Sequence, residues 1–554
     1  MRRRDFLQFA SSLPALALGA GAFGVASAQP AAARKLIDVH AHVFNATDLP
    51  ARRFLKIVFL HLHPEQDIER AIALDDRDVV DWLIALFIRV TSGRAPDARA
   101  EIAVLDGTGL APATAARDFR AADEETIRRV AEFLREPAPA AASARGRRSA
   151  AGAAKLKRAL QRAAGAGARD LSAASADEAQ GVARAAYFSG LDVGTYLRWF
   201  TLFSMYRHAL VDRLAEVHRQ QGYEPVLLAP ALIDYSKWLG EEVASPLADQ
   251  VEVMGRISRR PNGPAVHGYV AFDPLREVFH RRQNGQGPSP LETVRSALRD
   301  HGFLGVKLYP PMGFKPAGNA RGQQYPRAIL DALNHRVSAD LNRALDDLFA
   351  LCADQSAPVI AHTAESNPAG PEYARRADPA YWRPVLEKHP NLRVAFAHFG
   401  RFSSVSAAAP ANARLPESSW EWTFGGLLAA NSERPVYADL SYFSEALGDD
   451  AQQRRALAAT LRRFVRTFDP GVRHLMFGTD WIMLGVERGN ERYTEAVARF
   501  LQDECGFDAA AMDRFMFGNA VRFLGLARGE ATRERLDDFY RRHNVAGRLG
   551  AFDA

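Results

Sequence analysis

The chain has 554 residues, an apolar content of 47% and a formal net charge of +6 at pH 7. This length exceeds that of an ordinary domain, although a barrel with insertions reaches it, and the apolar content excludes a wholly disordered chain. A modest charge gives no support for a nucleic-acid-binding protein. The composition therefore indicates a globular protein with a large core.

The first 28 residues have the pattern of an export signal. Arg3 and Arg4 precede Phe6 and Leu7, and a weakly apolar run then ends in Ala-Ser-Ala at residues 26–28. The paired arginines resemble a twin-arginine signal, which exports folded proteins, and an ordinary secretory signal is the alternative. We expect a periplasmic or secreted protein, with the twin-arginine export machinery as a partner. No later apolar run is long enough to predict a membrane span.

The first predicted strand is "KLIDVHAHVFN", residues 35–45. Side chains alternate along a strand, so Asp38, His40 and His42 are expected on one face. Two imidazoles on one face can bind a single metal ion. A second pair with this spacing, His61 and His63, has no preceding aspartate and lies outside the strand pattern, so we do not expect it to bind metal.

A long stretch, residues 46–223, separates this strand from the next one. Helix-like segments occupy residues 78–90 and 195–218, which predicts a mostly helical insertion. Residues 136–185 are rich in Ala, Gly and Arg and predict a disordered linker. Within it, residues 141–169 carry eight Lys/Arg and no acid. A nucleic-acid or anionic-membrane patch is the alternative for this stretch, disfavoured because no aromatic residues are interleaved.

Residues 224–526 repeat a strand, loop and helix pattern. The seven apolar runs that mark its strands are residues 224–232, 265–274, 303–311, 357–365, 392–400, 435–443 and 474–482. With the strand at residues 29–45 they make eight β/α units, which predicts an α/β protein with a closed (β/α)8 TIM barrel. The absence of GxGxxG after the first strand weakens a dinucleotide-binding alternative. Residues 527–554 are expected to form a C-terminal helical tail.

Polar residues end several of these strands. His362 ends the fifth strand, His398 the sixth and Asp480 the eighth. The carboxyl ends of barrel strands meet at one mouth, so these side chains are expected to lie near His40 and His42. Imidazoles and a carboxylate form a good zinc site that leaves one position open for water. The pattern predicts a metal centre.

The motifs "IDVHAHVF", "VIAHTAE", "VAFAHFG" and "FGTDW" resemble those of the amidohydrolase superfamily, and most of all its amidohydrolase-2 branch. "GYVAFDP" and "FGNAVRFLGL" are also similar to that branch. The resemblance implies metal ligands at His40, His42, His362 and Asp480, holding one zinc ion. It also implies that His398 and Asp480 are the catalytic residues.

Lys307 in "GVKLYPP" leaves the number of metal ions open. In binuclear members of the superfamily a lysine at the end of the fourth strand is carboxylated and bridges two metals. A contact with a substrate carboxylate and a structural ion pair are the alternatives. We assign Lys307 and Tyr309 to substrate binding, and a second ion is expected only if Lys307 is carboxylated.

The leading functional hypothesis is a metal-dependent hydrolase that cleaves an amide, ester or lactone bond with metal-activated water. The alternative is a metal-dependent nonoxidative decarboxylase of an aromatic or enoic acid. A zinc-binding module without turnover is the third. The expected partner is a small-molecule substrate, not nucleic acid, and assembly into a homo-oligomer stays open. Cys352 and Cys505 lack CxxC spacing, so a cysteine zinc site is not expected, while one disulfide stays open.

Overall fold

The computed structural model of the chain describes residues 33–59, 77–108, 117–137, 143–166, 171–190, 192–333, 336–366, 368–370, 372–402, 419–430 and 435–553. The proposed export signal and the pair His61 and His63 lie outside the described residues.

Every strand pairing in the described chain is parallel. The strands are β1 (Arg34–Ala41), β2 (Tyr223–Pro230), β3 (Ala265–Val266), β4 (Tyr269–Ala271), β5 (Gly305–Leu308), β6 (Val359–His362), β7 (Val394–Ala397), β8 (Val436–Asp439) and β9 (Leu475–Met476). They pair in the orders β1-β2-β3 and β4-β5-β6-β7-β8-β9. Parallel pairing requires a crossover between successive strands, and helices supply it in both sheets.

The two sheets join into one ring. Only two residues separate β3 from β4, and an isolated bridge pairs Ala231, after β2, with Tyr269 of β4. On the other side, the Val39 amide of β1 donates to the Phe477 carbonyl after β9 at 3.2 Å, and the Thr479 amide donates to the His40 carbonyl at 3.1 Å. With β3 and β4 sharing one position, the ring has eight positions. The predicted (β/α)8 barrel is confirmed.

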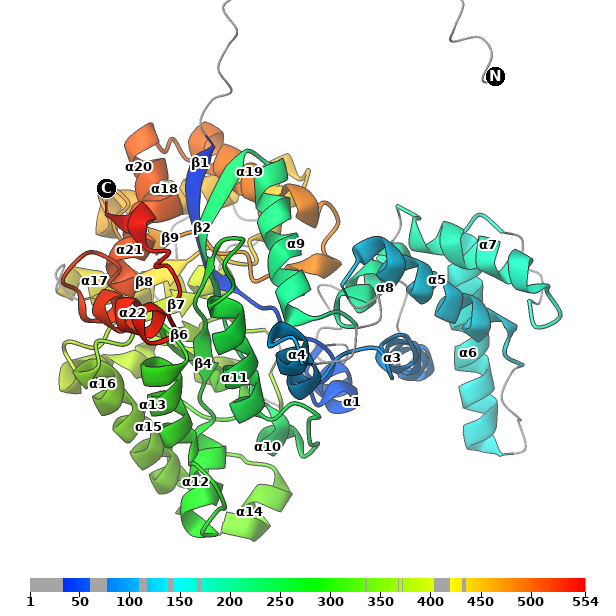
Figure 1. Ribbon diagram of the computed structural model, residues 1–554, viewed down its shortest axis with the longest axis horizontal. Coiled ribbons are helices and arrows are strands. Elements are labelled where there is room, and N and C mark those ends of the chain that lie inside the picture. The colour runs from blue at the N-terminus through cyan, green and yellow to red at the C-terminus, as the bar shows by residue number, and fades with distance from the viewer. Residues whose placement is uncertain are drawn as a thin grey trace, which may run out of the picture.

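Helices surround this ring (Figure 1). They are α9 (Arg207–Gln220), α10 (Ser236–Leu239), α11 (Leu247–Ser258), α12 (Pro274–Arg282), α13 (Pro290–Asp300), α14 (Arg327–Leu333), α15 (Val337–Asp354), α16 (Arg383–Lys388), α17 (Trp420–Ala430), α18 (Ala451–Phe468), α19 (Tyr493–Arg499), α20 (Ala509–Asp513), α21 (Asn519–Leu524) and α22 (Ala531–Arg542). Capping residues in the sequence determine where several of these helices begin. Ser289 and Glu292 form a capping box at α13, and Asp273 caps α12 with Pro274 as its first residue.

The barrel interior is filled from strand residues and closed by the end of the chain. Ile37, Val39, Ile360, Ala395 and Met476 belong to one buried cluster, which also contains side chains of α21 and α22. Lys35, near the start of β1, donates to the Ala551 carbonyl at 3.3 Å. The C-terminal segment therefore covers the amino-terminal end of the barrel, and the opposite end is left for a site.

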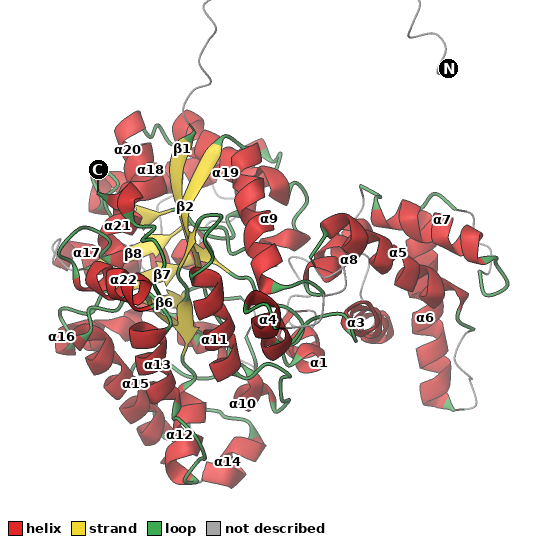
Figure 2. Cartoon of the chain, viewed as in Figure 1, coloured by secondary structure: helices red, strands yellow, loops and turns green. Residues whose placement is uncertain are grey.

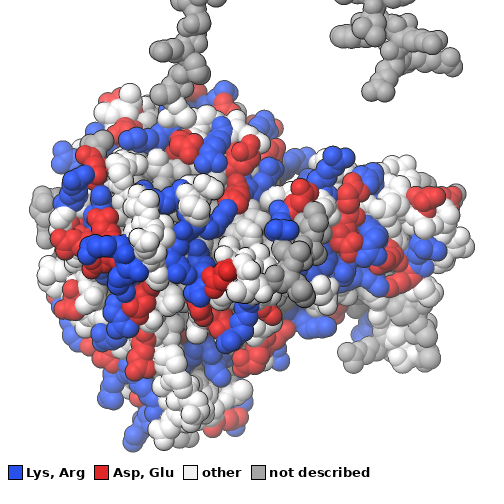
Figure 3. All heavy atoms as spheres, viewed as in Figure 1, with Lys and Arg blue, Asp and Glu red and all other residues white. Residues whose placement is uncertain are grey.

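A second group of helices forms a lobe beside the barrel, and Figure 2 shows that it contains helices and loops. The helices between β1 and α9 are α1 (Ala51–Arg53), α3 (Arg77–Thr91), α4 (Ala98–Leu105), α5 (Phe119–Arg135), α6 (Ala144–Ala163), α7 (Ala176–Tyr187) and α8 (Asp192–Leu202), with a π-helical turn at Phe54–Phe59. α9 lies in the predicted insertion but packs along β2 as a barrel helix. On the face seen in Figure 3, basic and acidic side chains are mixed over barrel and lobe.

The expected disordered linker at residues 136–185 is wrong over most of its described length. α6 spans 20 residues of it, and α7 begins within it at a capping box formed by Ser175 and Glu178. Alanine and arginine are among the strongest helix formers, and α6 buries Leu156 and Leu160. The few large apolar residues are therefore spaced well enough to anchor a helix.

Two smaller expectations concern the cysteines and the membrane. Cys352 and Cys505 are both buried and free, so the disulfide left open by the sequence is not formed. Among the described helices, none is both long and apolar enough to cross a bilayer.

Candidate metal centre

The predicted site residues, and Asp439 with them, lie at the carboxyl ends of several strands. His40 is in β1 and His42 follows it, Lys307 is in β5, and His362 ends β6. His398 directly follows β7, Asp439 ends β8, and Asp480 lies after β9. Their side chains are buried or nearly so. His398 and Asp480 both have left-handed backbone angles, with φ of 66° and 55°. Non-glycine residues adopt this conformation rarely, and it is frequent at functional sites.

His42 and Asp480 face each other through two acceptor atoms. The His42 Nδ1 lies 2.8 Å from the Ala231 carbonyl oxygen, which can only accept, so Nδ1 carries the proton. In the neutral ring Nε2 then has a free lone pair, and it lies 3.1 Å from Asp480 Oδ1. Burial lowers the pKa of His42, which favours this neutral form. A lone pair and a carboxylate oxygen at this distance are placed to share one cation, either a proton or a metal ion.

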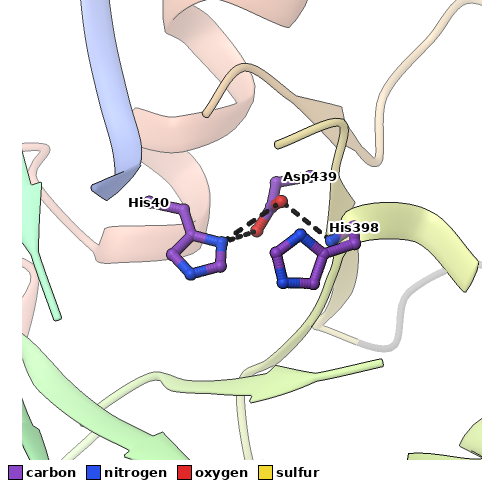
Figure 4. Close-up of side chains that lie close together, drawn as sticks. All are labelled: His40, His398 and Asp439. Carbon is purple, nitrogen blue, oxygen red and sulfur yellow. Dashed lines mark hydrogen bonds and ion pairs between the residues drawn. The ribbon is translucent and has the colours of Figure 1, made fainter. Parts of the chain in front are cut away.

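His40 is held from both sides of its ring. Its Nδ1 lies 2.8 Å from Ser441 Oγ and 3.3 Å from Asp439 Oδ2. Its Nε2 lies 2.7 Å from Lys307 Nζ and 3.5 Å from Asp480 Oδ1. Figure 4 shows Asp439 between His40 and His398, where Oδ1 also accepts from the His398 backbone amide at 3.0 Å. A carboxylate on the far nitrogen of a histidine is the usual second partner of a metal-binding imidazole.

His398 and His362 form a chain of hydrogen bonds. The His398 Nδ1 donates to the Ser441 carbonyl at 3.2 Å, so its Nε2 accepts from His362 Nδ1 at 3.0 Å. The His362 Nε2 then accepts from Ser366 Oγ at 3.1 Å. Burial lowers the pKa of His398 to about 3 and that of His362 well below its usual value. Both rings are therefore neutral at physiological pH.

Two sets of donor atoms lie close enough to hold an ion. The ligand atoms of His40, His42 and Asp480 all lie within 4.8 Å of one another, as do those of His40, His398 and Asp439. Burial raises the pKa of Asp480, but the three neighbouring histidines outweigh it and hold the pKa below its ordinary value. Neutral imidazoles with an ionised carboxylate are the donors that zinc prefers. The residues present therefore fit a divalent metal.

The positions of His362 and Asp38 differ from those predicted from the sequence. His362, predicted as a ligand, lies outside both sets and beside His398. Asp38 does not join His40 and His42, because its carboxylate accepts from Thr479 Oγ1 at 2.7 Å and lies 3.4 Å from His218 Nε2 of α9. The pairing of β1 with β2 shifts register between Asp38 and Ala41, so strict alternation fails there.

A cleft opens beside this centre. Lys307 and Tyr309 line it together with Tyr235, Trp238 and Asp273. The Tyr309 ring packs on His362 with centroids 4.3 Å apart. Burial lowers the pKa of Lys307 to about 8, so the side chain is still mainly charged at neutral pH. The two residues predicted for substrate binding therefore lie where the cleft meets the metal centre.

Sequence reasoning missed Asp439, Ser441 and Tyr235. Asp439 ends β8 as His362 ends β6, so the rule that located the histidines also applied to it. Ser441 contacts both His40 and His398, but its position two residues beyond the strand carries no signal. Tyr235 lies in the loop after β2, and only the folded chain brings its ring to 5.1 Å from that of Tyr309.

Residues 283–526 match a family model described as Amidohydrolase, of the amidohydrolase-2 type. This part of the chain belongs to the amidohydrolase superfamily. The matched residues include Lys307, His362, His398, Asp439 and Asp480, whereas His40 and His42 precede them. The two candidate metal sites combine three of the matched residues, His398, Asp439 and Asp480, with His40 and His42. No curated protein matches the chain.

Three solved structures are among those similar to this chain. An amidohydrolase from Burkholderia multivorans is 15% identical, with 57% of this chain and 88% of that chain covered and a TM-score of 0.36. A second structure of that description, with bound zinc, is 16% identical, with 57% of this chain and 87% of that chain covered and a TM-score of 0.32. An uncharacterised TIM-barrel protein from Bordetella bronchiseptica is 18% identical, with 58% of this chain and 91% of that chain covered and a TM-score of 0.31.

Proposed function

We propose that this chain is a hydrolase that uses one divalent metal ion, zinc by preference, to cleave an amide, ester or lactone bond of a small molecule. The observation that carries the proposal is the pair formed by His42 Nε2 and Asp480 Oδ1, 3.1 Å apart and both acceptors. A metal ion bound by His40, His42 and Asp480 would satisfy both atoms. When bound, such an ion polarises a carbonyl group and lowers the pKa of water to about 7.

The chain supplies groups that can move protons beside that ion. Asp480 is ionised and can accept a proton from the attacking water. His398 is neutral, and its hydrogen bond to the Ser441 carbonyl fixes which nitrogen carries the proton. Its Nε2 accepts from His362, and when that hydrogen bond opens the same lone pair can take a proton and pass it to a leaving group. Lys307 lies in the cleft and can bind a negatively charged part of the substrate.

The proposal is tested by metal analysis of purified protein, followed by assays with amides, esters, lactones and aromatic or enoic acids. We expect about one zinc per chain and hydrolysis that a chelator abolishes and zinc restores. Release of carbon dioxide from an acid, without hydrolysis of any panel member, would instead establish the decarboxylase. Metal binding without either activity would leave a zinc-binding module.

We also propose that residues 1–28 direct export by the twin-arginine route. Arg3, Arg4, Phe6 and Leu7 support it through their order. Replacing both arginines with lysine is expected to leave the precursor in the cytoplasm, as measured by cell fractionation. Unimpaired export of this variant would favour the general secretory route.

A further inference from the structure

The basic stretch for which the sequence predicted a disordered linker contains a helix with one charged face. α6 has 20 residues, and neither Asp nor Glu is among them. Its exposed cations are Arg147, Arg148, Lys155, Arg158 and Arg162. With about 3.6 residues per turn, these five side chains lie within roughly 100° of the helix circumference, along a stripe roughly 20 Å long. α6 therefore presents a row of positive charge to solvent, called here the basic face.

The other side of α6 holds the helix in the lobe. Leu156 and Leu160 are fully buried, and Ala153 is nearly so. The helix packs on α3, α7 and α8, and the Trp82 indole of α3 donates to the Ser149 carbonyl at 2.7 Å. Figure 1 shows α6 in the part of the lobe that lies farther from the barrel, beyond α3. Because packing uses the opposite side of the helix, the basic face is left available for a partner.

The composition of the basic face indicates what it can bind. α6 has no aromatic residue that could stack on nucleic-acid bases, and its only amide side chain, Gln161, is buried. Both of its leucines are buried, so the face offers no large apolar side chain that could insert between lipid tails. Arg and Lys bind phosphate groups through charge and hydrogen bonds. A straight row of these side chains fits a flat surface of phosphate head groups.

We propose that the basic face of α6 docks the protein on an anionic lipid bilayer. The interaction is electrostatic and peripheral, because each Lys or Arg close to an anionic surface adds to the attraction while no apolar group enters the bilayer. The inference goes beyond the proposed hydrolysis and does not depend on it. Export, as proposed above, would also place the chain beside a membrane and away from nucleic acid.

The test measures how much purified full-length protein sediments with sucrose-loaded vesicles. One set of vesicles is phosphatidylcholine alone, and the other contains about one third phosphatidylglycerol, which is anionic. In about 0.05 M NaCl the wild type is expected to bind the anionic vesicles at least about tenfold more strongly than the neutral ones. In about 0.5 M NaCl this preference is expected to disappear, because salt screens the charges.

The decisive variant carries glutamine, a good helix former, at all five positions of the basic face. The changes are Arg147→Gln, Arg148→Gln, Lys155→Gln, Arg158→Gln and Arg162→Gln. Its affinity for the anionic vesicles is expected to fall at least about tenfold. Residues 1–28 are the same in both proteins, so the difference reports on α6.

The matched control removes the same amount of charge from exposed positions on barrel helices and is expected to keep most of the binding. Its changes are Arg295→Gln, Arg343→Gln, Arg383→Gln, Arg455→Gln and Arg466→Gln. If the α6 variant does not fold, as judged by circular dichroism, Arg148→Gln combined with Arg162→Gln is expected to show a smaller loss. Lysine in place of the four arginines of the basic face is expected to preserve binding, because the charge is kept.

Three results would overturn the proposal. The first is that the wild type does not bind the anionic vesicles, or that the α6 variant binds them equally well. The second is that the barrel control loses as much binding as the α6 variant, since the attraction would then depend on total charge. The third is retardation of a short DNA duplex that depends on the basic face, without binding to vesicles, which would assign this face to nucleic acid.

Discussion

At the scale of single residues, His40 and His42 differ in what their nitrogens contact, although they share one motif. The His42 ring has its tautomer fixed by the Ala231 carbonyl, while the His40 ring lies between Asp439 and Lys307. In each ring Nδ1 already has a partner, the Ala231 carbonyl for His42 and Asp439 for His40. Neither ring can therefore bind a metal through Nε2 and also carry a proton in the reaction. We therefore expect both to act as ligands, and the other HxH pair to have no part in metal binding.

His42→Ala is expected to lose bound metal and activity together, because it removes a ligand atom that faces Asp480. His61→Ala and His63→Ala are the matched controls and are expected to keep about one metal per chain. Metal content is measured by elemental analysis of purified variants. Loss of metal in the controls, with retention in His42→Ala, would move the site into the insertion.

Lys307 and His398 decide between one and two metal ions. With one ion, Lys307→Ala is expected to keep the metal, because an unmodified, protonated Lys307 supplies no ligand atom and its removal frees His40 Nε2. His398→Asn is expected to keep the metal too, while activity falls by the ~10²–10⁴ typical of a lost acid or base. Both variants are measured for metal content and turnover. Two zinc ions in the wild type, decreasing in both variants and restored by bicarbonate, would show a carboxylated Lys307.

At the scale of elements, the insertion supports the mouth of the barrel. The Trp199 indole of α8 donates to the Ile482 carbonyl at 2.9 Å, two residues after Asp480. In the same region, the Phe203 carbonyl accepts from the Ala46 amide at 3.0 Å, and the Phe203 ring lies 5.8 Å from that of Phe44, two residues after His42. The lobe thus contacts the segments that follow two of the proposed ligands.

A buried ion cluster joins α4 and α9 to the segment that follows the first strand. Arg207 of α9 is 1% exposed and bonds to Asp48 at 2.5 Å and Glu101 of α4 at 2.9 Å. Burial opposes its charge, but these two carboxylates outweigh burial and raise the pKa of Arg207. Removing the arginine would leave buried Asp48 without its charged partner and Glu101 with only its contacts to His208.

Arg207→Met is therefore expected to lower the free energy of unfolding by about 3–5 kcal/mol, as for other broken buried ion pairs. Arg99→Met is the matched control, since Arg99 lies on α4 near Glu101 but is 81% exposed in its pair with Asp249. That change is expected to leave the free energy of unfolding nearly unchanged, because an ion pair exposed to water contributes little to stability. Urea unfolding of the three proteins measures both values, and equal losses would contradict the role of burial.

The regular spacing of apolar runs predicted the barrel, because each β/α unit has its own local sequence pattern. This pattern is present in the strand that contains His40 and in every unit from residue 224 onward. The same rule placed His398 and Asp480 near the β1 histidines, although their roles stay predictions. It could not place Ser441 or Tyr235, whose positions depend on loop conformation. It also failed at residues 136–185, where composition suggested disorder but helix propensity and two leucines were sufficient for α6.

At the scale of the whole molecule, the end of the barrel opposite the site depends on contacts between its strands and the C-terminal helix α22. His267, between β3 and β4, is fully buried. Its Nδ1 donates to the Gly302 carbonyl at 2.7 Å, and its Nε2 accepts from the Tyr540 hydroxyl of α22 at 2.8 Å. Both nitrogens are satisfied only in the neutral ring, because Nε2 must keep its lone pair.

This arrangement predicts a loss of stability in mild acid. Burial lowers the pKa of His267 to about 4, below the ~6.5 of an unfolded histidine. Between these values the unfolded chain binds more protons than the folded one, so stability falls as the pH falls from about 6.5 to 4. The contribution of this residue is about 3 kcal/mol. Urea unfolding at several pH values measures it as the difference in slope between the wild type and His267→Gln, in which glutamine can hydrogen-bond but not titrate. Parallel pH profiles in the two proteins would show that His267 is not the residue whose protonation loosens the barrel base.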